Sequence, residues 1–198
     1  IYIDFGPTSL SATPWNNITS HQESSTTSWI KDVENNYTNI GVRVLDGFTA
    51  THAGVGSEPA SPVTVDGVEF PLTAWKDGLL VKGEKNQGDV GPGRIEISQL
   101  DVARKYNFTI LAIRFNGSKD ARISSYKLVG KTESAVKEVK TGIKDAASFA
   151  AANFEEYIAK FENVEPDSEG KVIVEVKGLD TGSAAEGHIN ALCISLAK

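Results

Sequence analysis

The sequence predicts an all-β fold: a single antiparallel β-sandwich of jelly-roll type, with at most one or two short helical segments. Apolar residues recur at every second position in short runs, which is the pattern of half-buried strands. Glycine, proline and asparagine separate these runs, and no helical pattern alternates with them, so a parallel α/β fold is excluded. The chain has 198 residues, of which 40% are hydrophobic, so it can bury a sizeable core. No linker or repeat divides it, and we expect residues 1–198 to form one domain.

The strand pattern is regular enough to place the main strands. Ile95 and Ile97, for example, lie on one face of a run whose other face carries Glu96 and Ser98. Two later runs are apolar on both faces, as in strands that are covered on both sides. In chain order, the predicted strands cover residues 1–5, 40–48, 94–100, 106–115, 171–178 and 188–196.

Two segments fit the strand pattern less well. Residues 145–157 begin with an aspartate suited to an N-cap and are rich in alanine, which predicts a short helix or a loop. The polar stretch 20–39 is compatible with a loop, a short helix or an edge strand. Within it, Ile30 and Val33 have helical spacing, which indicates a turn of helix.

Charge and hydropathy exclude several partner classes. The formal net charge of −6 repels phosphate backbones and anionic lipid head groups, so we expect no nucleic-acid partner and no binding to a membrane surface. No apolar run approaches the roughly 18 residues of a membrane helix, so no membrane span is predicted. Since the chain starts at Ile1 and contains no methionine, we expect a mature product whose leader is absent.

The strong catalytic motifs are missing from the sequence. It contains no nucleophile elbow, zinc-protease motif, phosphate-binding loop or dinucleotide-binding glycine pattern. Its one cysteine, Cys193, excludes an internal disulfide and lies in an apolar run. His188 is predicted to be a hydrogen-bonded structural residue. We therefore predict no catalytic residue, no metal site and no cofactor. Whether the protein is an enzyme stays open, and the sequence favours a protein that is not.

Aromatic and guanidinium side chains suit sugar recognition, because a pyranose stacks its C–H face on an aromatic ring and its hydroxyls bond to polar groups. The predicted ligand-binding residues are Trp15, Asn16, Trp75, Arg114 and Arg122. Trp15 either contacts a ligand or plugs the end of the core. Arg114 either pairs with a carboxylate such as Asp4 or reaches into a cleft. Trp29 is assigned to packing.

Several segments together resemble the galactose-binding-like jelly-roll modules of Bacteroidetes-type bacteria. They include "YIDFGPT...PWNNIT" at the start, "VTVDGVEFPLTAWKDGLL" in the middle and "HINALCISLAK" at the end. The resemblance covers nearly the whole chain, although His188 stands where an aromatic residue is more usual and residues 145–156 are unusually rich in alanine. It implies association with carbohydrate and export from the cytoplasm, either by secretion or with a lipid anchor on an N-terminal leader.

We therefore expect a non-catalytic carbohydrate-binding module that acts outside the cytoplasm on a glycan or polysaccharide. One alternative is a glycan-directed hydrolase, which needs two facing carboxylates or a histidine facing a carboxylate, with His21, His52 and Asp77 as candidates. The other is a structural or adhesion module. Burial of the tryptophans separates these readings, because a wholly buried ring cannot stack on a sugar.

Overall fold

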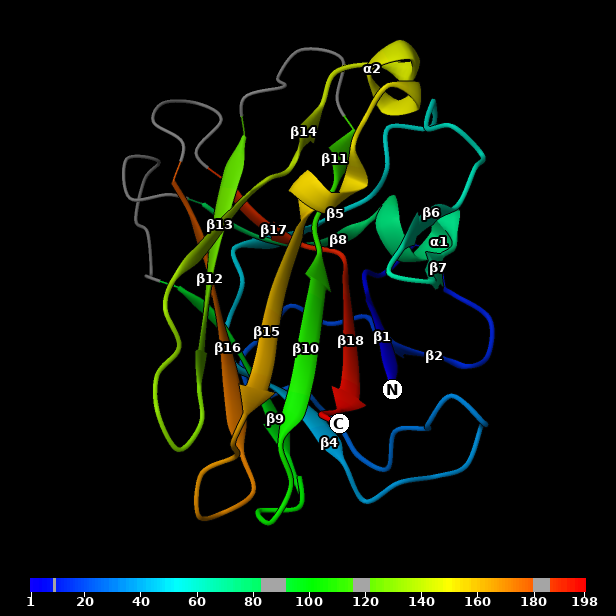
Figure 1. The fold of residues 1–198 in the computed structure, drawn as a ribbon. Coiled ribbons are helices and arrows are strands. Elements are labelled where there is room, and N and C mark those ends of the chain that lie inside the picture. Colours follow the sequence, from blue (N-terminus) through cyan, green and yellow to red (C-terminus); the bar gives the residue numbers. More distant parts are fainter. Residues whose placement is uncertain (9, 83–91, 116–121, 180–185) are drawn as a thin grey trace.

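The computed structural model describes residues 1–8, 10–82, 92–115, 122–179 and 186–198, and its main feature is a pair of large sheets that face each other (Figure 1). The first has the strand order β15-β10-β18-β1-β2, and the second has the order β13-β12-β16-β9-β4-β3. Most neighbouring strands are antiparallel. This confirms the predicted antiparallel β-sandwich of jelly-roll type. The strands of the first sheet are β1 (Tyr2–Phe5), β2 (Trp15–Ile18), β10 (Tyr106–Leu111), β15 (Ile158–Val164) and β18 (Ala191–Leu196). Those of the second are β3 (Thr26–Thr27), β4 (Gly41–Asp46), β9 (Gly93–Ser98), β12 (Ile123–Val129), β13 (Lys137–Lys140) and β16 (Val172–Gly178).

The main hydrophobic core fills the space between the two sheets. The longer strands contribute every second residue to it, as the period-two pattern predicts. From the first sheet come Ile3, Phe5, Phe108, Ile110, Leu192 and Ile194, and from the second Val42, Val44, Ile95, Ile97, Val172, Val174 and Val176.

A second hydrophobic cluster covers one end of the outer face of the first sheet. It is formed under the hairpin of β6 (Val63–Val65) and β7 (Val68–Phe70), and under the short helices α1 (Leu72–Trp75), α2 (Ala146–Ala150) and η1 (Phe154–Tyr157). In β10 and β18, Leu111 and Ala191 face this cluster while Ile110 and Leu192 face the main core. This explains why both strands are apolar on both faces.

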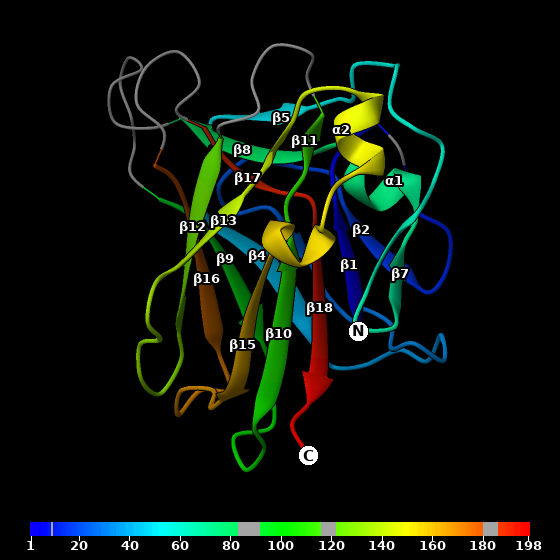
Figure 2. The same ribbon diagram turned by 45° about the horizontal axis from the view of Figure 1, so that its top comes forward.

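Two small sheets lie at the same end of the sandwich (Figure 2). One pairs β17 (Glu186–Ile189), β8 (Gly78–Lys82) and β5 (Ala50–His52), and the other pairs β11 (Arg114–Phe115) with β14 (Gly142–Ile143). Strand β17 passes very close to β16, because a Cβ at Gly187 would lie 2.4 Å from the carbonyl carbon of Lys177. Only glycine permits this approach.

The two irregular segments have different outcomes. Helix α2 confirms the short helix predicted after Asp145, whose side chain accepts the N–H of Ser148 at 2.8 Å. The helical turn predicted around Ile30 and Val33 is wrong, because the described stretch 28–40 is a loop that buries Ile30 and leaves Val33 50% exposed. Trp29 was expected to pack, but its side chain is 67% exposed. In the part of the chain that the structure describes, none of the helices has the length and apolar character needed to cross a membrane.

Candidate functional site

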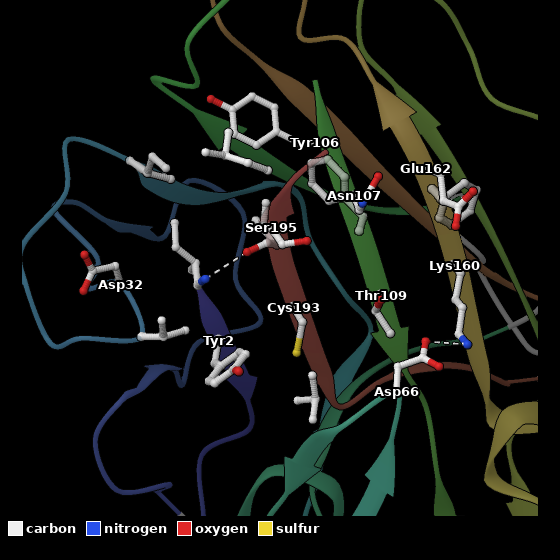
Figure 3. Close-up of a pocket in the computed structure, with 18 of the residues that line it drawn as sticks. Tyr2, Asp32, Asp66, Tyr106, Asn107, Thr109, Lys160, Glu162, Cys193 and Ser195 are labelled. Carbon is white, nitrogen blue, oxygen red and sulfur yellow. Dashed lines mark hydrogen bonds and ion pairs between the residues drawn. The ribbon is translucent and has the colours of Figure 1, made fainter. Parts of the chain in front are cut away.

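The outer face of the first sheet is hollowed into a groove of about 720 Å³ where the second cluster does not cover it (Figure 3). Tyr2, Cys193, Thr109 and Lys160 lie side by side across its floor, because each is paired with the next on the adjacent strand. The groove thus crosses the four strands β1, β18, β10 and β15. Its volume is within the range of ligand sites, roughly 300–1,000 Å³.

The groove exists because the outward residues change character along each strand. In β10, the outward residues Asn107 and Thr109 are polar and half-buried, whereas Leu111 at the covered end is apolar and buried. Strand β15 repeats the pattern, with Lys160 and Glu162 after Ile158. Polar outward residues cannot support a hydrophobic layer, so the covering elements end there.

One wall of the groove is the loop of residues 28–40. A backbone bridge between Lys31 and Tyr37 closes it, and the Asp32 carboxylate accepts the N–H groups of Glu34 and Asn36, both at 2.9 Å. These bonds, that from Asn36 above all, lower the pKa of Asp32. The wall is therefore an ordered loop whose turn carboxylate is already engaged.

Asn16 ties this wall to the sheet. Its side-chain amide donates to the carbonyl oxygens of Tyr2 and Lys31, both at 2.9 Å, and its Oδ1 accepts the N–H of Lys31 at 2.7 Å. The side chain of Asn16, which was predicted to bind a ligand, thus makes its hydrogen bonds within the protein. We assign it the role of anchoring the loop.

Exposed aromatic side chains stand on the same loop. Trp29 is 67% exposed and Tyr37 is 75% exposed, with the Lys31 ammonium 4.9 Å from the Tyr37 ring centre. Inside the groove, Tyr2 is half-buried and its ring centre lies 5.1 Å from that of Trp15. Tyr2 therefore supplies aromatic surface within the groove, whereas Trp29 and Tyr37 are exposed on the wall loop without lining the groove.

The opposite wall carries an ion pair. The Lys160 ammonium lies 2.5 Å from the Asp66 carboxylate and 2.8 Å from that of Glu155. On the floor, burial raises the pKa of the Cys193 thiol to about 12. Cys193 therefore stays protonated and contributes a small, inert surface.

The predicted tryptophans differ in what they offer a ligand. Trp15 is half-buried between Tyr2 and Phe70, so it supports the aromatic floor of the groove. Trp75 has no exposed surface: it stacks on Phe149, with ring centres 4.9 Å apart, and its indole N–H donates to the Ser61 carbonyl at 3.3 Å. A ring without an exposed face cannot stack on a sugar, so the ligand role predicted for Trp75 does not fit this structure.

The predicted arginines lie at the other end of the molecule, among the small sheets. Arg114 Nη1 lies 3.0 Å from His52 Nδ1, so its side chain does not pair with Asp4 as one alternative proposed. Arg122 is only 3% exposed and forms an ion pair with Glu186 at 3.3 Å. Trp15 and Asn16 therefore contact the groove residue Tyr2 without lining the groove themselves, while Arg114 and Arg122 belong to a different region.

His52 is paired with Gly78, next to Asp77, but the side chains considered for hydrolysis have other partners. His21 is bonded to its neighbour Gln22, His52 is buried beside Arg114, and the buried Asp77 accepts the backbone N–H and hydroxyl of Thr8. Across the described ranges, no group of three or more histidine, cysteine or acidic side chains has a geometry that could hold a metal ion.

Comparisons with known proteins give distant similarities. No family model matches the chain. No curated protein matches it either. One similar solved structure is TmCBM61 in complex with β-1,4-galactotriose, at 13% identity, with a TM-score of 0.35 over 61% of this chain and 71% of that one. Another is BtGH115A, described as a 4-O-methyl-α-glucuronidase with specificity for decorated arabinogalactans, at 12% identity and a TM-score of 0.37. That alignment covers 77% of this chain but only 18% of the other. Neither similarity is close enough to indicate what this chain binds.

Proposed function

We propose that this protein is a non-catalytic carbohydrate-binding module and that a glycan chain lies in the groove on the first sheet. The observation that carries the proposal is an open groove whose floor combines polar, half-buried residues with the half-buried Tyr2 ring, next to exposed aromatic rings on the loop that forms one wall. Sugars combine apolar C–H faces with many hydroxyl groups, so this combination of aromatic and polar surface matches them.

The floor offers mainly uncharged hydrogen-bonding groups. Thr109 and Ser195 contribute hydroxyl groups, which both donate and accept. Asn107 Oδ1 accepts the backbone N–H of Asn163 at 3.0 Å, which fixes the orientation of its amide. Groups that are already oriented lose little entropy when a ligand binds.

The carboxylates around the groove favour binding over the hydrolase alternative. Asp32 is engaged by its own loop, and Asp66 is paired with Lys160. Among the described lining residues, this leaves Glu162 as the carboxylate with no ion pair. Glycoside hydrolysis needs two cooperating carboxyl groups on opposite sides of the scissile bond.

We further propose that residues 1–198 act as one domain and meet their glycan outside the cytoplasm. Such a module needs no cofactor, because stacking and hydrogen bonding alone provide its affinity. Export by secretion or with a lipid anchor stays a prediction.

Isothermal titration calorimetry with a panel of soluble polysaccharides tests the proposed function. We expect at least one neutral polysaccharide to bind the wild type, and Thr109→Val to weaken that binding by about fivefold, since a lost hydrogen bond contributes roughly 1 kcal/mol. Thr27→Val, at an exposed position on β3, is the matched control and should bind like the wild type. Absence of binding across the panel, or equal binding by the two variants, would reject the groove as the site.

A further inference from the structure

A cluster of charged and imidazole side chains lies at the end of the sandwich, away from the groove. We call it the Arg/His cluster, and it consists of His52, Arg114, Arg122, Glu186 and His188. These residues come from β5, β11, β17 and the residue just before β12, so elements far apart in sequence meet there (Figure 2).

Strand β12 fixes the position of β17 in this cluster. The Ser124 hydroxyl accepts the N–H of His188 at 2.9 Å, and the Tyr126 hydroxyl donates to the carbonyl of His188. Because Gly187 also lets β17 approach β16 closely, Glu186 and His188 are held firmly. The cluster is therefore a built arrangement on strands.

Positive charge exceeds negative charge among the groups in direct contact. Arg114 and Arg122 are both cations, and the one carboxylate in the cluster, Glu186, accepts from Arg122. His188 first, and then the two arginines, lower the pKa of Glu186 to about 2, so it is ionised. Burial lowers the pKa of His52 and of His188, so both imidazoles are neutral at pH 7.

The nearby carboxylate of Glu58 does not neutralise the excess positive charge of the cluster. Burial, followed by the neighbouring Arg122, lowers the pKa of Arg114 although Glu58 lies near it. The Glu58 oxygens instead accept the backbone N–H groups of Val55 and Gly56. Among the ion pairs between described residues, none joins Glu58 to Arg114.

Several guanidinium donors in the cluster have no acceptor. Within the described part of the chain, Nε and Nη1 of Arg122 and Nε of Arg114 are buried and make no hydrogen bond. Buried donors are normally satisfied, and charged ones most of all. The described part of the chain therefore supplies no negatively charged acceptor for these three donors.

We propose that the Arg/His cluster is a second binding site, which takes the carboxylate of an acidic ligand between Arg114 and Arg122. Arg114 is half-exposed and provides the approach, while the buried Arg122 supplies further donors once the anion has entered. A carboxylate suits the site because a planar guanidinium can bind it through paired N–H groups, and the contact of Arg122 with Glu186 uses Nη2 alone. Adjacent guanidinium groups exclude a cation here.

This proposal does not depend on the groove, and calorimetry with sodium glucuronate, glucose and sodium sulfate tests it. Glucuronate presents the carboxylate, glucose is its uncharged counterpart, and sulfate separates a carboxylate site from a general anion site. We expect the wild type to bind glucuronate at millimolar concentration or tighter, and at least tenfold more tightly than glucose or sulfate. Thr109→Val should leave this affinity unchanged.

Two variants locate the site. Arg114→Gln should weaken glucuronate binding at least tenfold, while Arg104→Gln should not change it, because the Arg104 side chain is 66% exposed in a separate ion pair with Asp101. Arg122→Lys keeps the charge but loses the planar donor set, so it should also weaken binding, with circular dichroism as the check on folding. No binding of glucuronate, equal binding of sulfate, or full binding by Arg114→Gln would each overturn the proposal.

Discussion

The groove and the Arg/His cluster place polar side chains in opposite environments. The groove arranges half-buried hydroxyl and amide groups on regular strands, where water reaches them. The cluster buries Arg122 and His188 at 3% and 0% exposure among short strands. The polar groups in the groove therefore lose little hydration free energy when the chain folds, whereas those in the cluster lose most of theirs.

A contribution to folding stability does not by itself explain why the cluster contains buried ion pairs. Buried ion pairs seldom stabilise a protein more than apolar residues of the same shape would. The pairing of Glu186 with Arg122 and His188 is thus weak evidence for a structural role alone. Substitutions of buried polar residues at the cluster end should accordingly lower stability more than substitutions in the groove.

The largest effect on stability is expected for Asn190→Ala, next to the cluster. Asn190 has no exposed surface, accepts the N–H of Ile113 at 2.7 Å and donates to the carbonyls of Trp75 and Asp77 at 2.9 and 2.6 Å. Its loss leaves buried backbone groups unsatisfied, so we expect the free energy of unfolding to fall by about 3 kcal/mol in urea titrations. Asn39→Ala, at an exposed site, should change it by less than about 0.5 kcal/mol. Equal effects of the two would contradict the anchoring role.

Glu186→Gln should remove a pH-dependent contribution to stability at the cluster end. The pKa of Glu186 is about 2 in the folded protein against an ordinary 4.5, so its ionised form stabilises the fold by up to about 3 kcal/mol above pH 4.5. This contribution disappears as pH falls toward 2. Wild type and variant should therefore differ most at pH 7 and converge in acid, as measured by urea unfolding across that range. Glu162→Gln in the groove is the control and should leave the free energy of unfolding close to that of the wild type, since Glu162 is exposed and forms no ion pair with another described residue. A difference between wild type and Glu186→Gln that is constant with pH would contradict the ion pairing.

Asn16→Ala should act on the wall of the groove. Losing its bonds to Tyr2 and Lys31 should cost roughly 1–2 kcal/mol of stability and also weaken glycan binding, because the loop 28–40 loses its anchor. Asn17→Ala is the matched control, since its amide bonds to Ser11 and holds a different loop. It should cost similar stability in thermal unfolding while leaving calorimetric binding intact. Equal losses of binding in both variants would show that general loosening is the cause.

The smallest effect on stability is expected for Trp29→Ala. The side chain is 67% exposed, so its removal should change the free energy of unfolding by less than about 0.5 kcal/mol. Glycan affinity should nevertheless fall several-fold if the ring stacks on sugar, since such contacts contribute roughly 1 kcal/mol. Val136→Ala, exposed at 59% elsewhere, controls for loss of apolar surface. Unchanged affinity in Trp29→Ala would restrict the site to the floor of the groove.

The fold could be predicted from the sequence because its signal is local. Alternation such as Ile95 and Ile97 against Glu96 specifies which face of a strand is buried. The loop 28–40 could not be read in this way. Its conformation depends on Asn16, a distant residue, and on a positive φ of 55° at Trp29, which residue type alone does not indicate.

The sites were harder to predict because they join residues across the sheets. Arg114 and Arg122 were predicted as ligand-binding residues, but the Arg114 partner His52 lies on another small sheet. The groove did leave a signal. The outward positions of β10 change from polar at Thr109 to apolar at Leu111. This change marks the edge of the second hydrophobic cluster on the outer face of the sheet.

That switch has a consequence for how the molecule can change over evolutionary time. In β10, Phe108 and Ile110 face the core, while Asn107 and Thr109 face the groove. The residues that stabilise the fold and those proposed to contact glycan therefore alternate along the same strand. Substitutions at the groove positions can change which ligand is preferred without any change in the core residues. An insertion or deletion of one residue would exchange the two sets. Related chains are therefore expected to diverge here by substitution, with the strand length conserved.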